Sequence, residues 1–233
     1  MWEGKMKNAE VLERLRHKLI VSCQALEDEP LHGSRIMARM AYAAYVGGAS
    51  GIRANTPEDV FAIKEAVPLP VIGLYKKVYH DSEVYITPTI NEIERMVDCG
   101  SDIVAIDATN RQHPYKQTID ELFEKARTKF PDMLFMADCS DLHECLHAQE
   151  LGFDIVGTTM RSYTTYTKGI KIPDFELFQK LKDALTIPFI AEGGIWEPLQ
   201  LRESFECGAF AAVVGTAITR PQIITRRFVD AIR

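Results

Sequence analysis

The feature that most constrains the fold is a repeat of short apolar runs, each followed by a segment with a helical pattern. Their starts lie roughly 20–35 residues apart, about what a strand, a helix and two loops require. The runs are apolar at odd and even positions alike, which is typical of parallel strands covered on both faces. The expected strands are 19–24, 49–53, 70–76, 102–108, 134–138, 154–159, 188–194 and 211–216.

The segments between these runs carry helix signals. Thr56 followed by Pro57 is an N-cap with proline at the first helical position, and Thr89 with Glu92 three residues later predicts a capping box. No GxGxxG motif follows the first run, which disfavours the alternative of a doubly wound sheet. The chain is therefore predicted to form a single-domain TIM (β/α)8 barrel over residues 1–233, with an N-terminal helix closing one end.

Composition limits the classes of partner. The net charge of −6 argues against nucleic-acid binding and against an anionic membrane surface. No apolar run approaches the ~20 residues of a membrane span, and residues 1–18 carry charges of both signs, unlike a secretory signal. The 5 cysteines form no CxxC pair, which favours reduced thiols in the cytoplasm.

Polar residues gather where the predicted strands end. In a TIM barrel the carboxyl ends of the strands meet at one mouth, where the chemistry takes place. A single charge after a strand is usually where the chain meets water, but charges at several strand ends would converge on one site. These residues are Gln24, Arg53, Lys76, Lys77, Asp107, Asp138, Thr158, Thr159 and Glu192.

The last two strand ends are rich in glycine. The loops after strands seven and eight of such barrels commonly bind phosphate, because glycine lets backbone N–H groups approach the oxygens. Gly193 and Gly215 lie at these two ends, Thr216 follows, and Arg220 could supply a counter-charge. A phosphorylated small molecule is the predicted ligand.

Lys76 and Glu192 suggest proton transfer. A lysine can act as a base if burial or a neighbouring cation lowers its pKa, and Arg53 on the adjacent strand could be that cation. Glu192 would lie across the barrel. Two acid/base groups on opposite faces of one carbon can invert a stereocentre next to a carbonyl.

Several strings together resemble the bacterial N-acetylmannosamine-6-phosphate 2-epimerase family. The resemblance spans roughly residues 19–230, with one motif at nearly every strand end. The strings are LIVSCQAL, GIRAN, PVIGLYKK, MAD, GFDIVGTT, the Tyr-Thr-x-Tyr run at 163–166, IAEGG and VVGTAITRP.

The resemblance implies a TIM barrel of sialic-acid and amino-sugar catabolism that needs neither metal nor organic cofactor. It implies that Lys76 and Glu192 are the acid/base pair, with Asp138 supporting the site. Gln24, Arg53 and Arg220 match substrate-binding positions, and Arg220 with the Gly193 and Gly215 backbones would hold the phosphate. The family usually has glycine where this chain has Thr216, whose hydroxyl could add a hydrogen bond. A homodimer is also implied.

Alternatives remain at several positions. Lys76 could instead form a Schiff base in an aldolase or lyase, or the barrel could bind a phosphosugar without catalysis. Asp107 could orient a catalytic group, assist ring opening or cap the next turn. The apolar face of the last helix, 221–232, could pack on the barrel or help to form a dimer. His143 and His147 stand four apart, but no carboxylate spacing completes a metal site, and no histidine ends a strand.

The two lysines of PVIGLYKK are not equivalent. Side chains alternate along a strand, so Ile72, Leu74 and Lys76 share one face while Lys77 takes the other. Parity alone leaves open which face is the barrel interior. The family match selects Lys76 as the residue that enters the site.

Overall fold

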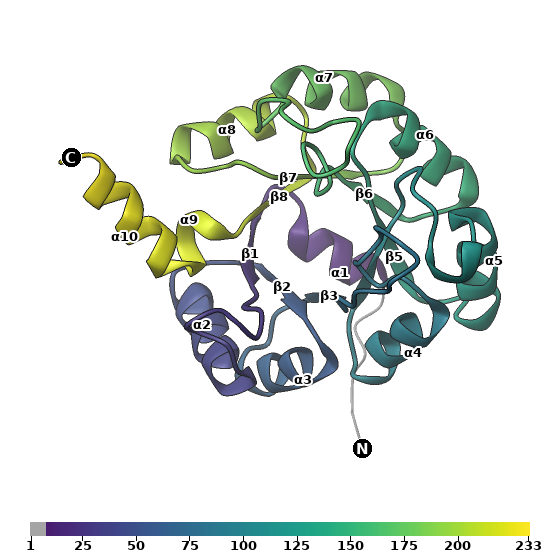
Figure 1. Cartoon of the computed structure of the whole chain (residues 1–233), viewed down its shortest axis with the longest axis horizontal. Coiled ribbons are helices and arrows are strands. Elements are labelled where there is room, and N and C mark those ends of the chain that lie inside the picture. Colours follow the sequence, from purple (N-terminus) through teal and green to yellow (C-terminus); the bar gives the residue numbers. More distant parts are fainter. Residues whose placement is uncertain (1–7) are drawn as a thin grey trace.

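A closed parallel barrel forms the centre of the computed structural model, which describes residues 8–233 (Figure 1). Each strand pairs with its neighbours in sequence, and β8 returns to pair with β1. The predicted TIM barrel is therefore confirmed. The strands are β1 (Leu19–Cys23), β2 (Gly51–Asn55), β3 (Val71–Leu74), β4 (Ile103–Asp107), β5 (Leu134–Asp138), β6 (Ile155–Gly157), β7 (Phe189–Glu192) and β8 (Ala211–Val214).

Helices alternate with the strands and surround the barrel (Figure 1). Thr56 caps α3 by accepting a hydrogen bond from the Asp59 N–H, as its place before Pro57 predicts. The helices are α1 (Asn8–Leu15), α2 (Ser34–Val46), α3 (Pro57–Ala66), α4 (Ile90–Asp98), α5 (Ile119–Lys129), α6 (Leu142–Leu151), α7 (Phe175–Ala184), α8 (Pro198–Glu206), α9 (Thr216–Thr219) and α10 (Pro221–Asp230), with a 3-10 turn, η1 (Pro114–Lys116).

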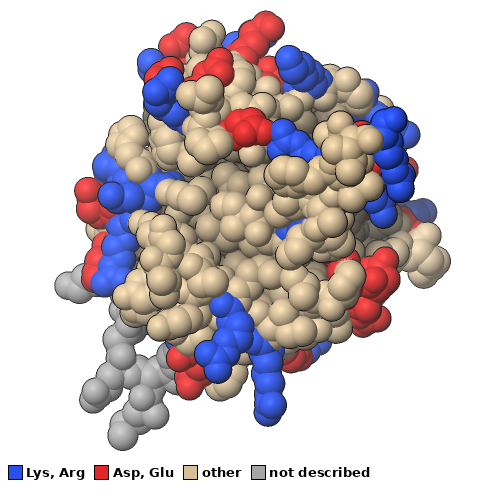
Figure 2. All heavy atoms as spheres, turned by 90° about the vertical axis from the view of Figure 1, so that its left-hand side faces the viewer, with Lys and Arg blue, Asp and Glu red and all other residues tan. Residues whose placement is uncertain are grey.

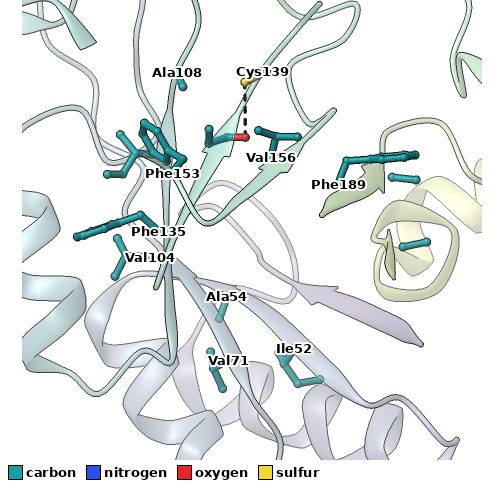
Figure 3. Close-up of a cluster of buried hydrophobic side chains, with 14 of the residues drawn as sticks. Ile52, Ala54, Val71, Val104, Ala108, Phe135, Cys139, Phe153, Val156 and Phe189 are labelled. Atoms are coloured by element: carbon teal, nitrogen blue, oxygen red, sulfur yellow. Dashed lines mark hydrogen bonds between the residues drawn. The ribbon is translucent and has the colours of Figure 1, made fainter. Parts of the chain in front are cut away.

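The apolar residues of the strands form two separate clusters. Ile20, Ile72 and Ile190 belong to the cluster inside the barrel. Their neighbours on the other parity belong to the cluster between strands and helices, part of which is shown in Figure 3 with Val104 and Phe135. This double burial explains why the strands read as continuous apolar runs.

Helix α1 closes the barrel at the amino ends of the strands. Val11 and Leu15 are buried in the inner cluster, and Asn8 donates a side-chain hydrogen bond to the carbonyl of Asp132, just before β5. This confirms the predicted N-terminal lid. The sequence prediction also covered residues 1–7, which lie outside the described part of the chain. The opposite end of the barrel, where the strands have their carboxyl ends, carries the predicted site residues.

The position of β2 corrects the sequence prediction. The strand was expected at 49–53, but it runs from Gly51 to Asn55, because the turn after α2 includes Gly48 at a φ of 96° and continues through Ser50. Arg53 therefore lies in the middle of the strand rather than at its end. Its side chain is buried inside the barrel with 1% exposure.

Candidate active site

A cavity of about 550 Å³ opens at the carboxyl ends of the strands, a size typical of small-molecule sites. All but one of the predicted site residues line it. Asp138 is the exception, because it lies fully buried at the end of β5 and reaches the site through Arg53. The predicted residues on the cavity wall are Gln24, Arg53, Lys76, Glu192, Gly193, Gly215, Thr216 and Arg220.

The two lysines after β3 point in different directions. Lys76 lines the cavity, and its backbone N–H is held at 2.8 Å by the side-chain oxygen of Asn55 on β2. Lys77 turns outward, and its ammonium lies 2.9 Å from Glu92 on α4. The difference in orientation predicted from strand parity is confirmed, with Ile72 and Leu74 in the inner cluster below Lys76.

Arg53 joins two carboxylates at the floor of the cavity. Its Nη1 lies 3.0 Å from Asp138 Oδ1 and 3.1 Å from Glu192 Oε2, and its Nη2 also pairs with Asp138. Burial lowers the pKa of Arg53, but the two carboxylates more than reverse this, so that its pKa lies above the ordinary value. The guanidinium therefore stays charged and fixes Glu192 in place.

The electrostatic surroundings move Lys76 and Glu192 towards neutral pH. Burial, followed by the charges of Arg53 and Arg220, lowers the pKa of Lys76 to about 8. Burial raises the pKa of Glu192, and the charge of Asp138 adds to this effect while Arg53 opposes it. A base and an acid with shifted pKa values in one cavity are typical of proton-transfer sites.

The loops after β7 and β8 form the other side of the cavity. Gly193 adopts a φ of 111°, and Gly215 precedes the short helix α9 that begins at Thr216. Arg220 faces the cavity and pairs with Glu29 at 2.8 Å. Backbone N–H groups and a guanidinium in this arrangement could bind an anion.

Gln24 brings a buried acceptor to the cavity wall. Its amide nitrogen donates to Ser22 Oγ at 2.9 Å, while its Oε1 is buried and has no hydrogen-bond partner within the described residues. A buried polar atom without a partner costs stability, so this oxygen is suited to accept a hydrogen bond from a ligand.

Asp107 caps the turn after β4. It accepts hydrogen bonds from the backbone N–H and the hydroxyl of Thr109 and pairs with Arg111 at 2.5 Å. Burial raises its pKa, and Arg111 opposes the shift. Of the roles left open by the sequence, these contacts favour the turn cap.

Two further residues support the predicted ones. The Thr159 hydroxyl lies 2.6 Å from Asp138 Oδ1 and 3.2 Å from Glu192 Oε2, and Asn55 holds the backbone of Lys76. Thr159 was visible as a polar strand end, but its partners lie on β5 and β7. The sequence could not predict these contacts, because they depend on the relative register of strands.

No group of three His, Cys, Asp or Glu side chains that could hold a metal occurs within residues 8–233. His147, considered as a ligand with His143, instead bonds Asp120 at 3.0 Å on the outside of the barrel. Across the same residues, none of the helices is both long and apolar enough to cross a membrane.

Comparison with known proteins places the chain in a family. Residues 37–233 match the family model described as "Putative N-acetylmannosamine-6-phosphate epimerase". A relative from Caldanaerobacter subterraneus subsp. tengcongensis, named "Putative N-acetylmannosamine-6-phosphate 2-epimerase", is 50% identical to this chain over 224 residues. The match covers 96% of this chain and 94% of the relative. A relative of the same name from Clostridioides difficile is 49% identical over 222 residues, and this match covers 95% of this chain and 99% of the relative.

A solved structure agrees with these sequence matches. The N-acetylmannosamine-6-phosphate 2-epimerase from Clostridium perfringens superposes with a TM-score of 0.90 at 47% identity, covering 94% of this chain and 95% of that one. Epimerases are isomerases, so the predicted enzyme class agrees with these names. The chain belongs to the N-acetylmannosamine-6-phosphate 2-epimerase family.

Proposed function

We propose that this protein interconverts N-acetylmannosamine 6-phosphate and N-acetylglucosamine 6-phosphate by removing and returning the proton at C2. The observation that carries the proposal is the pairing of Lys76 and Glu192 across one cavity, each with its pKa shifted towards neutrality. Family membership supplies the substrate class. The resemblance further implies a place in sialic-acid and amino-sugar catabolism.

The barrel topology suits this pair to the two faces of a substrate. Lys76 follows β3 and Glu192 ends β7, and these strands are half a turn of the barrel apart. A sugar lying across the mouth would therefore have one group on each side of C2. Because epimerisation needs a proton removed from one face and delivered to the other, this arrangement meets its geometric requirement.

The reaction begins with the open-chain sugar, whose C1 carbonyl makes the C2 proton acidic. In one direction, neutral Lys76 removes this proton, and the electron pair of the C–H bond moves into an enolate. With a pKa of about 8, roughly a tenth of Lys76 is neutral at pH 7. Protonated Glu192 then delivers its proton to the opposite face of C2. The reverse direction exchanges the two roles.

The other residues position the substrate and the acid. The resemblance implies that Arg53 binds the substrate, but both of its Nη atoms contact carboxylates, so we assign it to holding Glu192 and lowering the pKa of Lys76. The sugar phosphate would bind to Arg220, Thr216 and the Gly193 and Gly215 backbones. Gln24 Oε1 would accept a hydrogen bond from the substrate.

Direct conversion tests the proposal. Purified protein is mixed with N-acetylmannosamine 6-phosphate without added metal or cofactor, and NMR follows the appearance of the gluco epimer. Conversion supports the epimerase, and its absence would favour a barrel that binds a phosphosugar without catalysis. Borohydride reduction in the presence of substrate tests the remaining rival, because covalent labelling of Lys76 would indicate a Schiff base.

We infer further that the protein forms a homodimer through α10. No residue of this helix is buried; Phe228 on the helix is 72% exposed, and Ile232 just after it is 87% exposed. In Figure 1 α10 extends away from the barrel, and Figure 2 shows that this side is largely uncharged and hollowed, with charges mostly at its margin. A second copy of the chain would cover this apolar surface.

A cytoplasmic location remains a prediction. Fractionation of the producing cells, with detection of the protein in the soluble cytoplasmic fraction or outside it, would test it.

A further inference from the structure

Glu144 is a buried carboxylate next to the site that the proposed reaction does not use. It lies in the first turn of α6 with 1% exposure. Its Oε2 accepts hydrogen bonds from the backbone N–H and the hydroxyl of Ser140, at 2.6 and 2.7 Å. Its Oε1 accepts from the backbone N–H of Asn110 at 2.9 Å and from the hydroxyl of Tyr166. Burying a carboxylate is costly, and these four donors occupy its acceptor positions.

The donors come from three consecutive loops at the mouth of the barrel. Asn110 follows β4, Ser140 follows β5 and Tyr166 belongs to the long connection between β6 and α7. One carboxylate therefore ties these three loops together. The Tyr166 bond is the contact that joins Glu144 to the β6–α7 connection, residues 158–174.

The same connection forms part of the cavity wall. Met160, Tyr163 and Ile172 line the cavity beside the loop after β7. The segment contains neither strand nor helix from 158 to 174, and Ser162 adopts a φ of 72°, a left-handed conformation that is strained for serine. Such a conformation persists only when surrounding contacts fix it.

We propose that Tyr166 and Glu144 are positioning residues that latch the 158–174 loop against the barrel and so form the substrate-binding wall. An ion pair between Arg161 and Asp174, at 2.7 Å, joins two ends of the loop, and the tyrosine hydroxyl fixes its middle. The two tyrosines of the Tyr-Thr-x-Tyr run therefore have different roles. Tyr163 faces the cavity, while Tyr166 fixes the loop that carries Tyr163.

Tyr166→Phe is the variant that isolates the latch. It deletes the bond to Glu144 together with the contacts of the same hydroxyl to Ser140 and Thr109. Glu144 keeps its three other donors, so the buried carboxylate is not left without hydrogen bonds. We expect hydrogen exchange of the 158–174 amides, measured by mass spectrometry without substrate, to become about tenfold faster. Exchange elsewhere and the melting temperature should stay near wild type. Tyr163→Phe is the matched control, because its hydroxyl has no hydrogen bond within the described residues, and it should leave loop exchange unchanged.

Kinetics, which rest on the proposed function, separate positioning from direct catalysis. Tyr166→Phe should raise KM about five- to tenfold while kcat changes by less than about twofold. On a Glu144→Ala background the same change should raise KM by no more than about twofold further, because alanine has no oxygen to accept the hydrogen bond from the Tyr166 hydroxyl. A full additional loss on that background, or unchanged loop exchange in Tyr166→Phe, would overturn the latch. An inactive wild type would refute the epimerase proposal and leave the exchange result as the test of the latch.

Discussion

The site depends on how adjacent residues are given different surroundings. Lys76 and Lys77 are chemically identical, yet one faces the cavity with its pKa lowered by burial and by Arg53, while the hydrogen bond to Glu92 raises the pKa of the other. Strand parity predicted that the two lysines face different ways, and the family resemblance selected Lys76 for the cavity. Glu92 was expected to complete a capping box with Thr89. It binds Lys77 and the Thr89 hydroxyl instead, so that prediction was wrong.

Lys76→Ala should lower kcat by at least about 10³-fold, because a positioned proton-transfer group is removed. Lys77→Ala should change kcat and KM by less than about twofold, because Lys77 is outside the cavity and buried Glu92 keeps its hydrogen bonds from Tyr79 and Thr89. Steady-state rates of both purified variants test this prediction. Equal losses in the two variants would mean that the assignment of strand faces to function is wrong.

Lys76 should also reduce stability at neutral pH. Its pKa falls from 10.5 to about 8 on folding, so keeping the ammonium charged in the folded state costs free energy of folding. This penalty is fully present below pH 8 and disappears as the pH rises to about 10.5. Lys76→Met should therefore raise the free energy of unfolding by about 1–3 kcal/mol at pH 7, after allowance for partial solvent screening. Denaturant titrations at pH 7 and 10 should show the advantage shrinking, and an advantage that grows with pH would contradict the assigned burial cost.

The positions of the candidate site residues were predictable where they depend on place in the sequence, and their contacts were not predictable where these depend on strand register. Lys76, Glu192 and Gln24 reach the cavity from predicted strand ends. Arg53 was expected at an end and lies mid-strand, because the glycine turn before β2 displaces the strand start. Thr159 bridges carboxylates on two other strands, and nothing local in the sequence encodes that contact.

Among the elements, the strand-to-helix connections carry the tightest constraints. Gly194, after β7, adopts a φ of 71°, and a Cβ there would lie 2.6 Å from the backbone carbon and oxygen of Ile172. The β7 loop and the 158–174 loop therefore approach each other at a point where only glycine fits. This contact joins the predicted phosphate side of the cavity to the neighbouring wall formed by the 158–174 loop.

Gly194→Ala should separate these two loops. We expect kcat/KM to fall by at least about tenfold and the free energy of unfolding to fall by about 2–4 kcal/mol, from strain and steric overlap together. Gly169→Ala is the control, because Gly169 has a φ of 85° but open space around the missing Cβ. It should cost only about 1 kcal/mol and leave kinetics near wild type. Similar losses in both variants would show that backbone strain, and not the loop contact, is responsible.

At the scale of the whole molecule, the repeating pattern of strands and helices was sufficient to predict the barrel. Periodicity and the absence of a GxGxxG motif after the first run carried that prediction, and the closed order from β1 to β8 confirms it. A single domain over residues 1–233 stays a prediction. The position of α10 could not be predicted, because an amphipathic helix has the same sequence pattern whether its apolar face packs on its own barrel or on another copy of the chain.

The dimer inferred from α10 should dissociate when its apolar face is charged. Phe228→Asp combined with Ile232→Asp should give monomers in sedimentation-velocity experiments at micromolar concentration, where the wild type sediments as a dimer. Val78→Asp is the control, since Val78 is 86% exposed on the loop after β3 and should not affect assembly. A monomeric wild type, or a double variant that still dimerises, would contradict the inference.

The central claim is that one solvent-exchangeable group removes the C2 proton and a second such group delivers a proton to the opposite face. Epimerisation in heavy water tests this claim directly, with N-acetylmannosamine 6-phosphate as substrate and NMR as the readout. The account predicts that the N-acetylglucosamine 6-phosphate formed carries deuterium at C2, since Lys76 and Glu192 face a cavity open to solvent. A product that retains the original proton at C2 would contradict it.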